Sequence, residues 1–63
     1  MEIREMILQT LKAAGNPISA ATIAQLTGLD KRVVAQALVL LKRDGEVISP
    51  VRSRWQAAEQ NGD

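Results

Sequence analysis

Residues 18–48, ISAATIAQLTGLDKRVVAQALVLLKRDGEVI, decide the fold of this 63-residue chain. Apolar residues recur at helical spacing over residues 20–27 and again over residues 31–44, and a glycine follows each stretch. Ser19 and Asp30 stand immediately before the two stretches. Because serine and aspartate are favoured N-caps and glycine commonly ends a helix, the sequence predicts two helices joined by a tight turn.

An earlier helix is predicted over residues 2–14. Glutamates in its first turn suit the positive end of the helix dipole, and Gly15 followed by Pro17 ends it. The apolar stripe that should face the core consists of Ile3, Met6, Ile7, Leu11 and Ala14.

The two later helices also have predicted inward faces. In helix 20–27, Ile23 and Leu26 should point into the core, and Leu29 should tuck under the turn that follows. On helix 31–44, a rotation of about 100° per residue gathers one contiguous apolar arc, which we expect to be buried. This arc consists of Val33, Val34, Ala37, Leu38, Leu40 and Leu41.

The hydrophobic period changes after the last predicted helix. Residues 46–49 and 53–56 are short strand candidates, joined by a turn over residues 50–52 in which Pro50 fits the second position of a type I turn. An isolated two-stranded hairpin is only marginally stable, so it should lean on the helices. We expect the lone aromatic residue, Trp55, to pack beneath it, although stacking on a base is an alternative.

These elements predict one domain over residues 1–57, mainly α with a small β-hairpin. Residues 57–63, AAEQNGD, lack any periodicity and are expected to fray. A disordered tail is therefore expected over residues 58–63.

The run from Ile18 to Ile48 resembles the winged helix-turn-helix domains of small bacterial and archaeal regulators. Their loose pattern is a short helix xxIAxxTGL, a helix xxxVxxxLxxLxxxG and then an apolar pair. The matching residues here are Ile23, Ala24, Thr27, Gly28, Leu29, Val34, Leu38, Leu41, Gly45, Val47 and Ile48. The resemblance implies a three-helix winged helix-turn-helix fold. It is less specific for function, because such domains bind B-DNA, Z-form nucleic acid, RNA or other proteins.

The outer arc of helix 31–44 is the candidate nucleic-acid-binding face. It consists of Lys31, Arg32, Ala35, Gln36, Val39, Lys42 and Arg43. All cations of this helix fall within the arc, while Asp30 and Asp44 stand at its ends. A solvated face usually mixes charges of both signs, so the arc favours a recognition helix, with Lys31 and Lys42 at phosphates. An ordinary solvated face is the open alternative.

The side chains at the centre of this arc suit the major groove of double-stranded DNA. Arginine pairs there with guanine and glutamine with adenine, so Arg32, Gln36 and Arg43 are expected at base edges or flanking phosphates. Ala35 and Val39 would let the helix approach closely or touch thymine methyl groups.

The hairpin offers a second set of cations. Strand alternation predicts Arg52 and Arg54 on one face, with Val51, Ser53 and Trp55 on the other. The two arginines can reach phosphates beside the helix. They are also typical of a solvated edge that discourages sheet aggregation, and this alternative stays open.

Some winged-helix relatives bind left-handed Z-form nucleic acid through an Asn and a Tyr on the recognition helix and a Pro pair before a wing Trp. This chain is similar in having Lys31, Pro50 and Trp55. It has Ala35 and Val39 where those relatives have Asn and Tyr, and it lacks the Pro pair. Z-form binding is therefore not the expected function.

Composition excludes several other classes of function. The chain has no Cys and no His, so neither a disulfide framework nor a common zinc site is predicted. No Ser stands in a nucleophile-like context and no Gly-rich phosphate loop appears, so we expect no enzyme activity, cofactor or small-molecule substrate. No apolar run approaches the ~20 residues of a membrane span, and the N-terminal MEIRE is not typical of a signal peptide, which favours a cytoplasmic location.

The positive charge is concentrated in the second half of the chain. Net charge is only +1, yet residues 28–57 carry six cations against three anions. We expect a transcriptional regulator that binds double-stranded DNA with its third helix in the major groove and its wing on the backbone. Since one small module gives modest affinity, a homodimer or a larger protein assembly is expected. The alternative is a protein-interaction module or accessory subunit that binds no nucleic acid.

Overall fold

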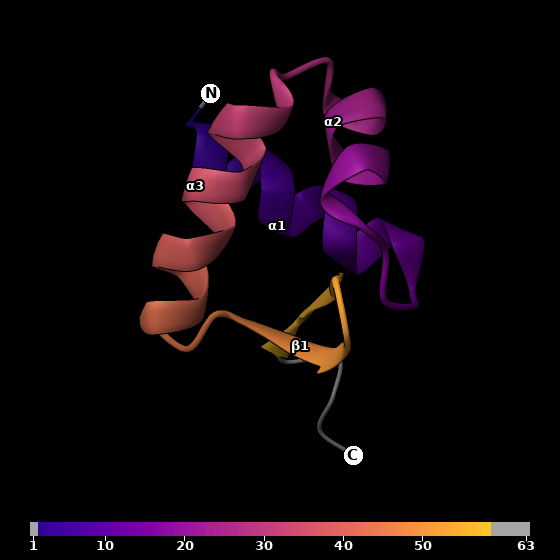
Figure 1. Ribbon diagram of the computed structural model, residues 1–63, viewed down its shortest axis with the longest axis vertical. Coiled ribbons are helices and arrows are strands. Elements are labelled where there is room, and N and C mark those ends of the chain that lie inside the picture. Colours follow the sequence, from indigo (N-terminus) through magenta and orange to yellow (C-terminus); the bar gives the residue numbers. More distant parts are fainter. Residues whose placement is uncertain (1, 59–63) are drawn as a thin grey trace.

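Three helices followed by an antiparallel hairpin make up this protein, whose computed structural model describes residues 2–58. The helices are α1 (Ile3–Ala14), α2 (Ala20–Thr27) and α3 (Lys31–Arg43), and the strands are β1 (Val47–Val51) and β2 (Arg54–Ala57). Figure 1 shows α1 behind α2 and α3, with the hairpin beyond the C-terminal end of α3. The predicted fold class, mainly α with a small β-hairpin, is confirmed.

The first turns of α2 and α3 are capped by local hydrogen bonds, as the sequence predicted. The Ser19 hydroxyl accepts a hydrogen bond from the Thr22 N–H at 3.2 Å, and the Asp30 carboxylate accepts one from the Arg32 N–H at 2.8 Å. Gly28, at φ 77°, ends α2 in the left-handed conformation that costs glycine nothing. The turn between α2 and α3 is therefore tight.

Each helix and each strand contributes at least one residue to the core. Its buried members are Ile7, Leu11, Ile23, Val34, Ala37, Leu38, Leu41, Val47 and Ala57. Leu29 and Trp55 are partly buried and pack against this cluster, which confirms both predicted placements. The core is aliphatic, and no charged or polar side chain among the described residues is buried in it.

Three apolar residues predicted to face inward are instead exposed. Leu26 is 64% exposed, because only one narrow face of the short helix α2 packs against the core and Ile23 is the buried residue on that face. Leu40 is 44% exposed, because it lies at the edge of the buried arc, about 100° around the helix from Leu41. Ile3, in the first turn of α1, is 38% exposed.

The hairpin turn lies later in the chain than predicted. Pro50 belongs to β1, and the turn residues are Arg52 and Ser53, with Ser53 at φ 63°. Proline is tolerated there because the register shifts between Ile48 and Val51, where a regular ladder hydrogen bond is not required. The expected type I turn at Pro50 is therefore wrong.

The hairpin is held at both ends. Near the turn, the Ser49 hydroxyl lies within hydrogen-bonding distance of the carbonyl oxygens of Val51 and Arg54, at 3.1 and 2.9 Å. At the other end, Val47 pairs with Ala57. Ala57 is buried and the Ala58 N–H donates to the Glu46 carbonyl at 2.9 Å, so the fraying expected from residue 57 does not occur at either alanine. Residues 59–63 of the expected tail lie outside the described residues.

A backbone bridge joins the hairpin to the start of α2. The Ile18 N–H donates to the Trp55 carbonyl at 3.0 Å, and the Trp55 N–H donates to the Ile18 carbonyl at 2.8 Å. The sequence predicted only an extended link at Ile18. The bridge means that the hairpin leans on the helices through paired backbone groups as well as through side chains.

Candidate nucleic-acid interface

The candidate interface is the outer face of α3 together with the hairpin, which we call the wing. Every residue predicted for this interface is exposed: Lys31, Arg32, Ala35, Gln36, Val39, Lys42, Arg43, Arg52 and Arg54. The exposure of the α3 residues follows from the burial of Val34 and Leu38 on the opposite side of the helix. What the exposed residues bind stays a prediction.

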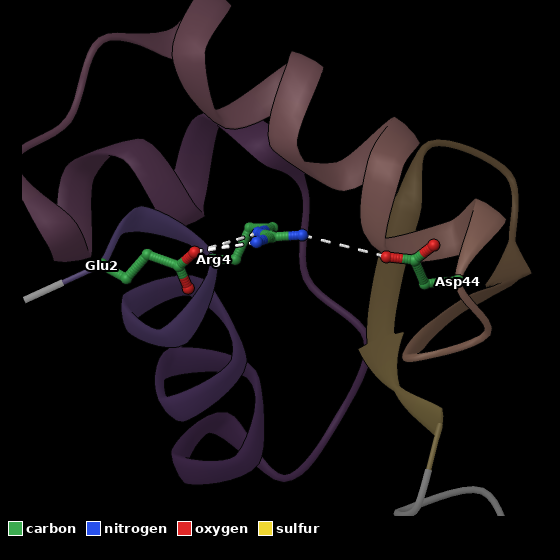
Figure 2. A network of polar contacts seen from close by, with 3 residues as sticks. All are labelled: Glu2, Arg4 and Asp44. Atoms are coloured by element: carbon green, nitrogen blue, oxygen red, sulfur yellow. Dashed lines mark hydrogen bonds and ion pairs between the residues drawn. The ribbon is translucent and has the colours of Figure 1, made fainter.

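The carboxylates nearest this face are engaged in local interactions. Asp30 caps the first turn of α3, as described above. At the other end of α3, Asp44 lies 3.9 Å from the Arg4 guanidinium, which also bonds to Glu2 at 2.8 Å (Figure 2). The hydrogen bond and the charge of Glu2 hold the pKa of Arg4 above its ordinary value. Neither ion pair found within residues 2–58 involves a cation of α3 or the wing.

Lys42 and Trp55 connect α3 to the wing. The Lys42 Nζ lies 5.9 Å from the centre of the Trp55 ring, within the range of a cation–π interaction. Trp55 is half-buried, so the same side chain packs against the core and meets a cation of the interface. The helix and the wing therefore present adjoining positive surfaces.

The wing arginines are not arranged as strand alternation predicted. Arg52 lies in the turn and Arg54 begins β2, and the left-handed Ser53 between them interrupts the alternation. Their assignment to one face of a regular strand is therefore wrong. Both arginines remain exposed, on the turn side of the wing.

An apolar area interrupts the cationic face of α3. Val39 is 61% exposed, and with Leu40 and Gln36 it lines an open depression of about 350 Å³. A second depression beside it, toward the start of α1, is also lined by Leu40 and Gln36, together with Ile3 and Val33. Sequence reasoning missed Leu40 as a surface residue. Its position at the edge of the apolar arc was the signal that could have identified it.

Residues 2–58 lack two other features, a metal-binding group and a membrane-spanning helix. No three Asp, Glu, His or Cys side chains gather there in a group that could hold a metal ion. Across the same residues, no helix is both long enough and apolar enough to cross a membrane.

Comparison with known proteins gives two findings. A family model described as an HTH domain matches residues 4–54, so the match covers α2, α3 and all of α1 except Ile3, and it ends one residue before Trp55. A relative from the rat, Rattus norvegicus, named Z-DNA-binding protein 1, is 32% identical over 53 residues. The aligned segment is 84% of this chain but 13% of that protein, so the chain corresponds to a small part of its relative.

Proposed function

Because this chain belongs to the helix-turn-helix domain family, we propose that it binds double-stranded DNA. Helix α3 lies in a major groove, and the wing holds the adjacent phosphate backbone. The major groove of B-DNA, about 12 Å wide, admits one α-helix, and the second helix of a helix-turn-helix pair is the one that enters it. In this chain that helix is α3 (Lys31–Arg43).

The exposure of every cation on α3 and the wing is the observation that carries this proposal. These cations are Lys31, Arg32, Lys42, Arg43, Arg52 and Arg54. Carboxylates at the ends of α3 are engaged in a helix cap and an ion pair, so they compete little for these cations. A polyanion is the partner that such a face attracts.

Different residues of the face have different roles in this proposal. Arg32, Gln36 and Arg43 face the groove, where arginine and glutamine can make paired hydrogen bonds with base edges and the two arginines can also reach flanking phosphates. Lys31 and Lys42 contact phosphates along the groove walls. The wing arginines contact phosphates farther along the backbone.

Transcriptional regulation is the biological activity that this binding mode best supports. A single module of 63 residues offers a small interface, and regulators of this kind gain affinity by presenting two modules to one site. We therefore propose that the chain acts as a homodimer or within a larger assembly.

Binding of left-handed DNA is a second candidate function, favoured by the name of the rat relative, Z-DNA-binding protein 1. Lys31 and Trp55, which this chain shares with winged-helix domains of that specificity, lie on the interface. Ala35 and Val39 lack the polar groups that Asn and Tyr supply at those positions, so B-form DNA remains the first candidate.

An NMR titration of the ¹⁵N-labelled chain distinguishes these functions. A mixed-sequence B-form duplex at low salt should shift amide signals of α3 and the wing and leave those of α1 largely unchanged. A second titration uses an alternating C·G duplex held in the left-handed form by brominated cytosines. Shifts with this duplex alone would favour the second candidate, and no shifts with either would refute DNA binding.

A matched pair of variants controls the titration. Arg32→Gln with Arg43→Gln removes two charges from the exposed face without touching the core, so its spectrum should keep the dispersion of the folded chain. We expect this variant to lose most of the DNA-induced shifts. Lys12→Gln on α1 removes a charge outside the proposed interface and should bind as the unchanged chain does.

A further inference from the structure

The apolar area on α3 has a composition and a position that phosphate binding does not explain. Val39 is 61% exposed and Leu40 is 44% exposed, and both line the depression next to Gln36. Phosphate groups interact with cations and hydrogen-bond donors, which two aliphatic side chains do not supply. A ligand that carries an apolar group would suit the depression better than phosphate alone.

Cations surround this apolar area. Around the helix axis, Arg32 lies about 20° from Val39 and Arg43 about 40° from it, one on each side along the helix. An apolar protein surface placed there would have to remove both guanidinium groups from water. A polyanion that carries small apolar groups between its charges would instead pair with these guanidinium groups, and double-stranded DNA is such a polyanion.

The thymine methyl group is the apolar group that base pairs present in the major groove. We propose that Val39 and Leu40 contact the 5-methyl groups of pyrimidines there, so that this chain prefers DNA rich in A·T pairs. The adjoining Gln36 amide suits the N6 and N7 atoms of adenine, the partner of thymine. This inference rests on the proposed function and adds a class of target sequence to it.

The same contact gives the chain a means of distinguishing DNA from RNA. Uracil lacks the 5-methyl group, so the corresponding RNA leaves Val39 and Leu40 without a partner. The major groove of A-form RNA is also too deep and narrow for side chains to read. The apolar area thus distinguishes thymine from uracil, while the shape of the groove excludes A-form RNA.

Replacement of thymine by deoxyuridine tests the inference directly, because it removes the methyl group and preserves base pairing. We would measure Kd by fluorescence anisotropy for an A·T-rich duplex and for the same duplex containing deoxyuridine. The expected loss is about fourfold per contacted methyl, which corresponds to about 0.8 kcal/mol for burial of one such group. Val39→Ala should reduce this difference, because only Leu40 then contacts a methyl group.

The matched control is Leu26→Ala. Leu26 is 64% exposed on α2 and lines neither depression, so its truncation should leave the difference between the two duplexes unchanged. Both variants alter exposed side chains, and circular dichroism verifies their helix content.

The outcomes separate this inference from the proposed function. Equal affinity of the unchanged chain for both duplexes, with strong salt dependence, would overturn the methyl contact and leave DNA binding standing. If Val39→Ala kept the full difference in Kd between the thymine and deoxyuridine duplexes, the assignment of the contact to Val39 would be overturned. Absence of salt-dependent binding to either duplex would refute the proposed function and this inference together.

Discussion

Removal of the two wing arginines should lower the slope of log Kd against log salt concentration, because each charge that contacts a phosphate contributes to that slope. The proposed interface carries six cations: Lys31, Arg32, Lys42, Arg43, Arg52 and Arg54. If each neutralises one phosphate, log Kd should rise with log salt concentration at a slope of about 5.4, since each contact contributes about 0.9. A fourfold rise in salt then weakens binding about 1,800-fold. With Arg52→Gln and Arg54→Gln, the slope should fall to about 3.6 and the loss to about 150-fold.

Fluorescence anisotropy of a labelled duplex, titrated between about 50 and 200 mM salt, measures this slope. Lys12→Gln is the control for the general loss of one positive charge, because Lys12 lies on α1 rather than on the interface. Emission from Trp55, which packs against the core beside the wing, reports whether each variant keeps the wing in place. A slope unchanged in the wing variant would refute the wing's role. A slope unchanged in Arg32→Gln with Arg43→Gln would refute the α3 face.

Three further substitutions test the structure that supports the interface. Asp30→Ala removes the acceptor for the Arg32 N–H and should cost about 1 kcal/mol, which lowers the melting midpoint measured by circular dichroism by about 4–8 °C. Lys42→Met keeps an unbranched side chain but removes the cation over Trp55, so urea unfolding should show a loss of about 0.5–1 kcal/mol. Gly45→Ala places a side chain at φ 79° with no atom within 4 Å of it, so backbone conformation alone should cost about 1–2 kcal/mol in the same assay.

Helix boundaries were predictable because the interactions that fix them are local. Ser19 and Asp30 each bond to a backbone N–H within three residues, and Gly45 adopts the left-handed conformation next to the end of α3. Such interactions involve residues that are close together in the chain, so they can be predicted from the sequence alone. The exposure of the cations on α3 was predictable for a similar reason, because helical periodicity places them opposite Leu38.

The errors concern positions that depend on neighbours distant in the chain. Leu26 and Leu40 fit an apolar period, but whether such residues are covered depends on how much of each helix its neighbours reach. The position of Pro50 depends on the register between two strands, which residue preferences alone did not reveal. For the candidate interface, residue types indicated which cations are exposed, and the edge position of Leu40 was a signal for its exposure. The second depression, which Leu40 shares with Ile3, depends on how α1 packs against α3 and could not be predicted from the sequence.

The backbone bridge between Ile18 and Trp55 affects how much conformational entropy the protein would lose on binding DNA. It ties the second strand of the wing to the residue that immediately precedes the cap of α2. The distance between the wing cations and α3 is therefore set within the free protein, through backbone pairing and the contact of Lys42 with Trp55. A surface whose spacing is already set loses less conformational entropy on association, so more of its interaction energy appears as affinity. The bridge makes the wing a preorganised part of the proposed DNA-binding surface.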